Sequence, residues 1–300
     1  MPRLKFAATS VRRDAAGPGE RTVSSRCECG IGQDVNRAAD CGNPGSRLAR
    51  SKIAGASVGR HRPSSQPGVQ WVAVTRLESL LRSLEKFYGV LAPPPRDPFT
   101  LFVWEVLSVH STPRKRDAAM AALKRIPAMT PDSMWRAPAK KLEEAVKAAG
   151  PYVENRLQAL RTGSELFRRS PDLPKTIRGP LPAARRALKP LPQLGETGAH
   201  RMLLFAADQP ILPVDARVSR VGRRLNYGET GGDFKKQSRG VQEAMVRELT
   251  ASADEYRRAF LYLSHHGGAT CTESDPHCVV CPLLKDCPEG KRRVGEGLRA

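Results

Sequence analysis

The sequence predicts an all-α protein, and three observations carry that prediction. Apolar residues recur at helical spacing, as at Leu77, Leu81 and Leu84. Pro follows Asp or Thr at several expected helix starts, for example at Asp97-Pro98, where the Asp caps the helix and the Pro occupies its first turn. No segment shows the sustained apolar–polar alternation of a half-buried strand. We therefore expect many short helices joined by turns.

The expected helices follow one another from about Trp71 onwards. The first presents a single apolar face made of Leu77, Leu80, Leu81, Leu84 and Tyr88. The Pro-rich segment 171–182 is expected to be a loop. The other expected helices occupy residues 99–109 and 118–123, a short stretch after Thr130-Pro131, residues 140–149 and 155–169, a segment beginning at 183–188, residues 197–207 and a segment opened by Asp215.

Residues 1–70 differ in composition from the rest of the chain. They are rich in Arg, Ser, Gly, Ala and Pro and have almost no apolar periodicity, so we expect them to be disordered. Their Arg content also suits an organelle transit peptide, and a start site placed too far upstream is a third alternative. Cys27, Cys29 and Cys41 lie in this segment and are interpreted as incidental thiols.

Charge and cysteine usage narrow the class of partner and the compartment. The net charge is +20 and the pI about 10.2, which favours a nucleic acid as partner over the alternative of a merely basic composition. No apolar run reaches the ~18 residues of a membrane helix, so no membrane partner is expected. Seven cysteines are too sparse for a disulfide scaffold, and no apolar segment typical of a secretory signal follows the N-terminus. The expected compartment is the reducing cytoplasm.

Residues 191–195, Leu-Pro-Gln-Leu-Gly, lie between two expected helices. Gly195 is expected to adopt the backbone conformation that a tight hairpin requires. Such a turn exposes backbone N–H groups at the start of the second helix, where they can hold a phosphate. The segment therefore predicts a helix-hairpin-helix element for DNA, with an ordinary helix–helix turn as the alternative.

Asp215 follows a short apolar stretch and opens a helix whose inner face carries Val218 and Val221. An Asp at this place is a common N-cap. It can also supply a catalytic carboxylate, and the two roles do not exclude each other.

Four cysteines near the C-terminus form the most specific pattern in the chain. Six residues separate the first pair, two the second and five the third, and such a set can close one metal centre, either a cubane iron–sulfur cluster or a zinc ion. The four are Cys271, Cys278, Cys281 and Cys287.

The hairpin, Asp215 and the cysteines, in this order and spacing, resemble the endonuclease III branch of the helix-hairpin-helix-GPD DNA glycosylases over residues 75–288. The resemblance implies a six-helix barrel at 92–208, with its hairpin at about 186–207. It also implies a cluster domain built from 71–91 and 209–290, before a flexible tail at 291–300. The expected cofactor is a [4Fe-4S] cluster on the four cysteines, with His265 and His266 in structural roles.

The expected function is base excision repair. The resemblance implies a monomeric hydrolase that flips a damaged or mismatched base out of double-stranded DNA and breaks its N-glycosidic bond. Asp215 matches the family's catalytic carboxylate and would stabilise positive charge on the sugar or activate a nucleophile. A bacterial, nucleoid-associated protein is expected, with organelle targeting by residues 1–70 as the alternative.

The chain departs from the family at the lysine that attacks the sugar in bifunctional members. Thr197 stands there, preceded by Glu196 where a basic residue is usual. We therefore expect a monofunctional glycosylase, as in a divergent bacterial subgroup. One alternative is a glycosylase/lyase that uses another amine, with Lys189 the nearest candidate. The other is a catalytically weak iron–sulfur protein that binds DNA.

Further site residues follow from the same resemblance. His110 stands where a Gln usually fills the space of the flipped base. Glu105 lies one residue from the catalytic Glu of adenine-specific mismatch glycosylases and is either a pocket acid or a polar residue paired with an Arg. The expected DNA contacts of the hairpin and its flanks are Leu191, Gln193 and Gly195 with Lys189, His200 and Arg201.

Overall fold

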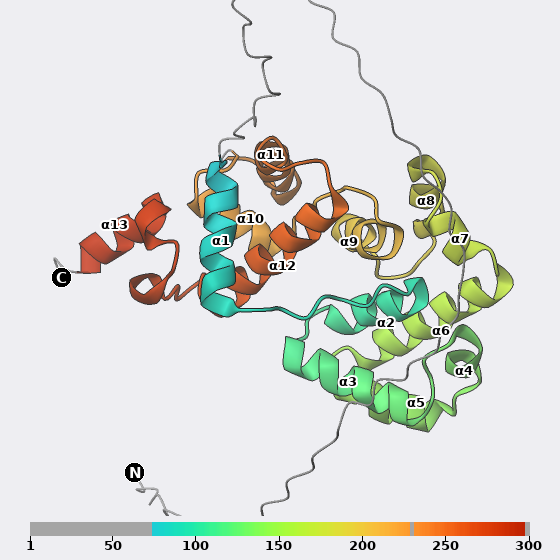
Figure 1. The fold of residues 1–300 in the computed structure, drawn as a ribbon. Coiled ribbons are helices and arrows are strands. Elements are labelled where there is room, and N and C mark those ends of the chain that lie inside the picture. The colour runs from blue at the N-terminus through green and yellow to red at the C-terminus, as the bar shows by residue number, and fades with distance from the viewer. Residues whose placement is uncertain (1–73, 229–230, 298–300) are drawn as a thin grey trace, which may run out of the picture. The chain divides into compact units, whose positions relative to one another are not determined.

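The computed structural model describes residues 74–228 and 231–297 of the 300-residue chain. The expected disorder of residues 1–70, and the three cysteines in that segment, lie outside the described residues. Within the described ranges the chain is helical and has no strand, which confirms the all-α prediction (Figure 1). The α-helices are α1 (Arg76–Tyr88), α2 (Pro98–Ser108), α3 (Pro113–Arg125), α4 (Pro131–Arg136), α5 (Ala139–Lys147), α6 (Val153–Arg169), α7 (Leu173–Ile177), α8 (Leu181–Leu188), α9 (Glu196–Ala207), α10 (Ala216–Arg224), α11 (Phe234–Val246), α12 (Ala253–Ala269) and α13 (Pro288–Gly297). Two 3₁₀ turns, η1 (Cys278–Val280) and η2 (Leu284–Asp286), precede the last helix.

Side-chain caps explain where many of these helices begin. In each case a Thr or Asp side chain accepts a hydrogen bond from the backbone N–H three residues later, which satisfies one of the unpaired donors of the first turn. Three of these helices also have Pro in the first turn. The capping residues are Thr75, Asp97, Thr112, Thr130, Asp215 and Asp233.

Three segments differ from the expected boundaries. Helix α3 begins at Pro113, before the expected 118–123, because the Thr112 cap starts it in a polar turn that carries no apolar signal. The expected loop 171–182 contains α7, which buries Ile177. The expected flexible tail is helical as far as Gly297, where Arg292 pairs with Glu289 and Glu296 along α13.

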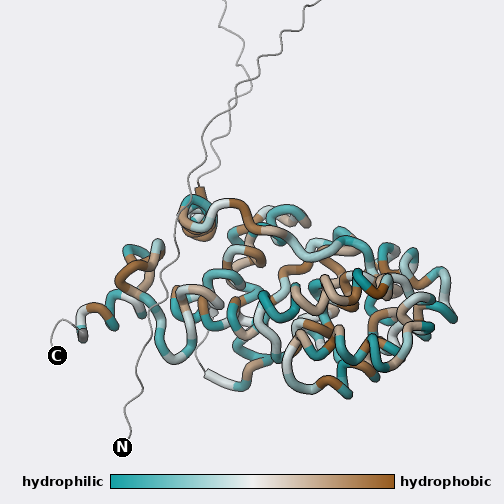
Figure 2. Tube along the Cα trace, turned by 90° about the horizontal axis from the view of Figure 1, so that it is seen from below, coloured by the Kyte–Doolittle hydropathy of each residue, from teal (hydrophilic) through white to brown (hydrophobic). Residues whose placement is uncertain are grey.

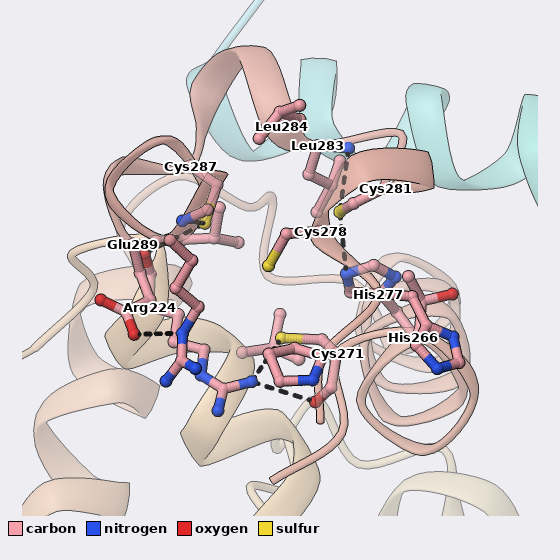
Figure 3. A pocket seen from close by; sticks show the side chains of 16 residues that line it. Arg224, His266, Cys271, His277, Cys278, Cys281, Leu283, Leu284, Cys287 and Glu289 are labelled. Carbon is pink, nitrogen blue, oxygen red and sulfur yellow. Dashed lines mark hydrogen bonds and ion pairs between the residues drawn. The ribbon is translucent and has the colours of Figure 1, made fainter. Parts of the chain in front are cut away.

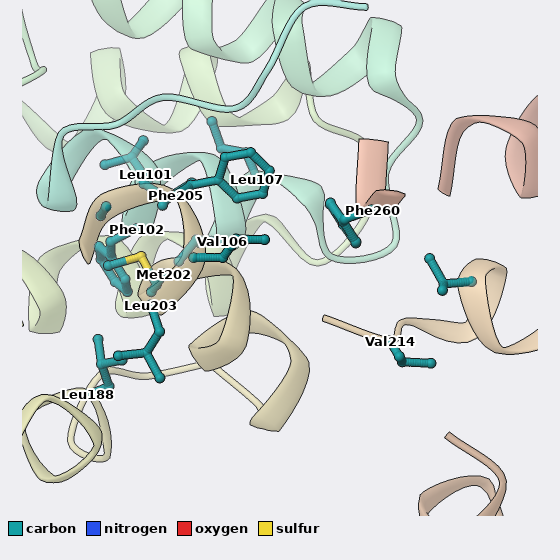
Figure 4. Close-up of a cluster of buried hydrophobic side chains, with 14 of the residues drawn as sticks. Leu101, Phe102, Val106, Leu107, Leu188, Met202, Leu203, Phe205, Val214 and Phe260 are labelled. Atoms are coloured by element: carbon teal, nitrogen blue, oxygen red, sulfur yellow. The ribbon is translucent and has the colours of Figure 1, made fainter. Parts of the chain in front are cut away.

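Part of the hydrophobic core forms around α2 and α9. Apolar side chains from both helices are buried against each other, as Figure 4 shows for Phe102, Leu107 and Leu203. Helix α2 also packs on α3, α6 and α7, while α9 packs on α7, α8 and α12. The rings of Phe205 and Phe260 lie 5.9 Å apart and join α9 to α12. Helix α9 therefore joins the helices that pack around α2 to the C-terminal helix α12.

Helix α1 packs against the C-terminal part of the chain, although it comes first in the sequence. Its predicted apolar face is confirmed, because Leu77, Leu80, Leu81 and Leu84 are all buried. Helix α12 contacts both α1 and α10, and α10 contacts α11. The guanidinium of Arg258 on α12 pairs with Glu78 and Glu85 of α1. The division into a barrel and a cluster domain stays a prediction.

Polar residues interrupt the apolar ones throughout the helices, as the alternating colours of the tube in Figure 2 show. Within residues 74–228 and 231–297, no helix has both the length and the apolar character needed to cross a membrane.

The contact of α2 with α6 depends on Gly163, because a methyl group added there would overlap the ring of Phe102. We expect Gly163→Ala to lower the free energy of unfolding. The overlap should cost roughly 1–3 kcal/mol, of which the better helix propensity of Ala returns about 1 kcal/mol. Gly231→Ala is the matched control, since the corresponding methyl group meets no atom within 4 Å. Urea unfolding of both variants measures the difference, and equal stabilities would contradict the packing described.

Candidate active site and metal centre

The chain forms the expected turn between α8 and α9, but a different residue adopts the left-handed backbone conformation. Gln193, not Gly195, has the left-handed backbone conformation, with φ of 58°, and its Nε2 donates to the Asn155 carbonyl at 2.8 Å. Gly195 has φ of −64° and is the N-cap of α9. The expectation for Gly195 was therefore wrong. Its small size instead leaves open space beside the N-terminal backbone of α9, because an added Cβ would meet nothing within 4 Å.

Asp215 is the N-cap of α10, as predicted, and Val218 and Val221 face inward. Its Oδ1 accepts the Val218 N–H at 2.8 Å, and its Oδ2 accepts the Ser264 hydroxyl at 3.1 Å. The carboxylate lines a cavity, open to solvent, with Trp104, Arg116, Arg201 and further residues of α10 and α12. The cap thus holds a carboxylate at a cavity large enough for a base.

Glu105 and Arg201 form a buried ion pair between α2 and α9. The Arg201 Nε donates to Glu105 Oε1 at 2.6 Å and its Nη2 to Oε2 at 2.5 Å. Glu105 is 4% exposed, and burial raises the pKa of its carboxyl by more than the Arg201 guanidinium lowers it. Burial lowers the pKa of Arg201, but the Glu105 carboxylate more than offsets this and the net shift is upward. Two short, parallel hydrogen bonds hold the guanidinium and the carboxyl group together.

Gly198 makes room for this pair. A Cβ at Gly198 would lie 3.4 Å from Glu105 Oε2 and 2.9 Å from Leu194 Cδ1. A glycine weakens the start of a helix, but at this position its lack of a side chain leaves space for the Glu105 carboxyl group. Glu105 is thus paired with an Arg, as one of the two readings of this residue expected, although it lies inside the molecule and not at an exposed helix edge.

Thr197 lies at a second cavity, also open to solvent, between the hairpin and α11. Its hydroxyl donates to the Val214 carbonyl at 3.3 Å, directly before Asp215 in the chain. Arg201 lines both cavities. Lys235 of α11 also lines the Thr197 cavity, whereas Lys189 is exposed at the end of α8 and lines neither.

The expected DNA contacts differ in how they are presented. Leu191 is buried under the hairpin, while Lys189 and Gln193 are exposed. His200 is partly buried, and burial lowers its pKa. Arg201 is turned into the protein towards Glu105 and, at 3.9 Å from its Nη1, towards Asp215 Oδ2. A phosphate contact by Arg201 was expected from the sequence, but its guanidinium is engaged inside.

His110 has an aromatic neighbour that the sequence did not reveal. Its ring lies 5.2 Å from that of Tyr152, both residues are exposed, and both have positive φ, 48° and 65°. The buried Arg156 joins their loops, donating to Val109 O at 2.6 Å and to the carbonyls of Gly150 and Pro151. Tyr152 carries no periodic signal, since only the fold brings it to His110.

The four C-terminal cysteines line one pocket, and their sulfurs face a common space (Figure 3). Cys271 follows α12, Cys278 begins η1 and Cys281 follows it, and Cys287 precedes α13. Three sulfurs accept hydrogen bonds, from Arg224 to Cys271 at 3.2 Å, from the Leu283 N–H to Cys281 at 3.4 Å and from the Gly290 N–H to Cys287 at 3.3 Å. Burial raises the pKa of the Cys278, Cys281 and Cys287 thiols, that of Cys281 to about 11.

The arrangement of these donors bears on the kind of metal group. Among the described residues, no group of three or more His, Cys, Asp or Glu side chains is placed to hold a single metal ion. Four cysteine thiolates around one space are the ligand set of either a zinc ion or a [4Fe-4S] cluster. His266 is buried beside this space, with Nδ1 2.8 Å from the Tyr88 hydroxyl and Nε2 3.7 Å from Cys281 Sγ.

Comparison with known proteins gives one consistent result. No family model matches the chain. Endonuclease III of Bacillus subtilis is 26% identical over 171 residues, which is 56% of this chain and 71% of the relative. Endonuclease III of Escherichia coli K12 is 26% identical over 197 residues, 66% of this chain and 86% of the relative.

Solved structures share the fold. A non-covalent endonuclease III–DNA complex matches with a TM-score of 0.60 and 22% identity, over 74% of this chain and 99% of that protein. A thermostable thymine-DNA glycosylase matches with a TM-score of 0.57 and 17% identity, over 72% and 97%. The chain is therefore endonuclease III-like in sequence and has the fold of the endonuclease III structures.

Proposed function

We propose that the protein is a DNA glycosylase of base excision repair and that it is monofunctional. The observation that carries this proposal is the position of Asp215, fixed by two hydrogen bonds at a base-sized cavity beside the hairpin helix α9. The similarity to endonuclease III, a DNA-bound example of which has this fold, supports it.

Asp215 would supply the electrostatic part of the reaction. Breaking the N-glycosidic bond leaves positive charge on the sugar, and a fixed carboxylate stabilises such charge in a poorly solvated site. Water then adds to the sugar in place of an enzyme amine. Thr197 supports this route, because its hydroxyl is bound to the Val214 carbonyl and offers no amine for a Schiff base.

Double-stranded DNA would lie across the hairpin side of the molecule. The exposed backbone at Gly195 and the side chains of Lys189 and His200 are the proposed phosphate contacts. The adjacent rings of His110 and Tyr152 are the proposed fillers of the space that the flipped base leaves. We propose a monomer acting on the bacterial nucleoid, with organelle targeting by residues 1–70 as the alternative that the chloroplastic relatives keep open.

The four cysteines would hold a [4Fe-4S] cluster. Their donor set fits it, since all four ligands are thiols around one space and three receive N–H donors, as cluster sulfurs commonly do. The cluster would fix the segment from Cys271 to α13 and leave the exposed Lys285 available to DNA.

A second candidate is a DNA-binding protein with weak or no catalysis. The observations that favour it are Thr197 at the position of the family lysine and the exposed Glu196 at the start of α9, where a carboxylate opposes phosphate binding. The half-buried, hydrogen-bonded Asp215 favours the enzyme.

The full chain should release free base from at least one duplex in a panel of oxidised pyrimidines, uracil, alkylated purines and mismatches. Asp215→Asn should lower the single-turnover rate by about 100-fold or more, because the fixed charge is lost. Ser264→Ala removes one hydrogen-bond donor to Asp215 but keeps the charge, so it should lower the single-turnover rate by a smaller factor. Unchanged release by Asp215→Asn would contradict the carboxylate mechanism. Duplex binding without release from any substrate would favour the second candidate.

Thr197→Lys should create a strand-cleaving activity that the natural chain lacks. A lysine there would place an amine in the cavity beside Val214 and Asp215, able to attack the sugar. Trapping with borohydride on a duplex with an abasic site should give a covalent adduct for Thr197→Lys only. His200→Lys, in the same cavity, is the matched control. An adduct formed by the natural chain would show that another amine acts, with Lys235 placed better than Lys189.

Protein purified without oxygen should be brown and contain about four iron and four sulfide per chain, as a [4Fe-4S] cluster requires. Cys278→Ala should lose most of this iron, whereas Cys41→Ala should keep it, because Cys41 lies outside the proposed ligand set. One zinc per chain with no sulfide would exclude the cluster.

A further inference from the structure

We propose that Arg201, held by Glu105, donates a hydrogen bond to the departing base and thereby restricts the site to neutral bases that leave as anions. This inference deepens the proposed function and rests on it. It gives Arg201 and Glu105 roles different from the phosphate contact and the pocket acid that the sequence suggested.

The geometry of the pair leaves one side of the guanidinium available. Glu105 accepts from Nε and Nη2, whereas Nη1 donates no hydrogen bond to any residue within 74–228 and 231–297. Nη1 lies 3.9 Å from Asp215 Oδ2. It therefore faces the cavity where a base would be cleaved, close to the carboxylate proposed to face the sugar.

The direction of this donor is fixed by its surroundings. Two short bonds to the buried Glu105 prevent the guanidinium from rotating, and its carbon lies 5.8 Å from the centre of the Phe260 ring. Gly198 leaves the space that the Glu105 carboxylate occupies. Glu105 is thus a positioning residue, because it touches Arg201 and not the substrate. A preorganised donor of this kind stabilises developing charge without a cost of reorientation.

The reaction needs such a donor on the base. When the bond between the sugar C1′ and the base nitrogen breaks, its electron pair stays with the base and positive charge develops at C1′. Water bonds to C1′ and loses a proton to Asp215, from which solvent removes it, and the base anion takes up a proton from solvent. Arg201 would donate from Nη1 to the oxygen or ring nitrogen next to the breaking bond, while Asp215 lies on the sugar side.

The other groups around the cavity argue for the same substrate class. Arg116, Arg201 and Arg217 line it, and Asp215 is the one carboxylate among the described lining residues. Asp117 pairs with Arg116 and Glu105 pairs with Arg201, and neither of these carboxyl groups lines this cavity. Arg116 also covers the face of Trp104 at 4.4 Å, the surface on which a cationic base would otherwise stack.

Purines methylated at N3 or N7 are cationic and depart as neutral molecules, so they gain nothing from a donor that stabilises an anion and are disfavoured beside these arginines. The fold does not decide this point, because a 3-methyladenine DNA glycosylase has a similar fold with a TM-score of 0.51. The substrate class follows instead from the charged side chains that line this cavity, which favour neutral bases such as deaminated or oxidised ones.

The test is a leaving-group comparison with the full, cluster-loaded chain. Single-turnover release is measured for uracil and 5-fluorouracil, which differ little in shape but differ in acidity, and for 7-methylguanine, each in the same duplex. Arg201→Met should slow uracil release by about 100-fold or more, and 5-fluorouracil release clearly less, because the better leaving group needs less help. In the same variant, the ratio of the release rate of uracil to that of 7-methylguanine should also fall.

Two further variants separate this role from folding. Glu105→Leu combined with Arg201→Leu replaces the buried pair by apolar side chains, which proteins tolerate better than removal of one partner, and should show the same altered leaving-group dependence. Arg168→Met is the control. Arg168 also lies over an aromatic ring, that of Trp135, but away from the cavity, so the release rates of this variant should match those of the natural chain.

Equal losses for uracil and 5-fluorouracil would overturn the role of Arg201 while leaving the glycosylase proposal intact. Faster release of 7-methylguanine than of either neutral base by the natural chain would overturn the substrate class. Failure to release any base from any duplex would overturn the proposed function itself, and this inference with it.

Discussion

Burial of α9 between α2 and α12 is the constraint on which the arrangement of the site depends. The apolar face of α9 is fully enclosed, and Phe205 contacts Phe260 across it. Because rotation of α9 would expose this face to water, the polar residues near its N-terminus point in fixed directions. Thr197 meets the segment before α10, and Arg201 meets α2 and Asp215. A hydrophobic contact thus sets the geometry of a charged site.

Local signals predicted much of this fold, because helix caps and apolar periodicity act within a few residues. Asp97 and Asp215 begin their helices as expected, and the buried faces of α1 and α10 were correct. Segments without an apolar periodic signal were missed. Helix α7 is too short for such a signal and buries Ile177, and α13 carries ion pairs between neighbouring polar residues that apolar periodicity ignores.

Among the site residues, too, those with a local signal could be predicted from the sequence, whereas those that depend on contacts between distant parts of the chain could not. Asp215 could be found because a cap has a local signature, whereas the pairing of Glu105 with Arg201 joins residues 96 positions apart. At the hairpin, the sequence pointed to Gly195 for the left-handed position, since Gly adopts it most easily. Gln193 adopts it instead, supported by a side-chain bond to Asn155 that only the folded chain provides.

The packing of α1 on α12 has a consequence for how the chain is made. Arg258 binds Glu78 and Glu85, 180 and 173 positions earlier, so α1 has no apolar surface to cover its leucines until α12 has left the ribosome. At about 5–20 residues per second, synthesis of that stretch takes on the order of 10 seconds or more. During this time α1 is an unshielded amphipathic segment that chaperones can bind. Completion of the fold is therefore controlled by the arrival of the C-terminal helices, the same part of the chain that carries the cysteines.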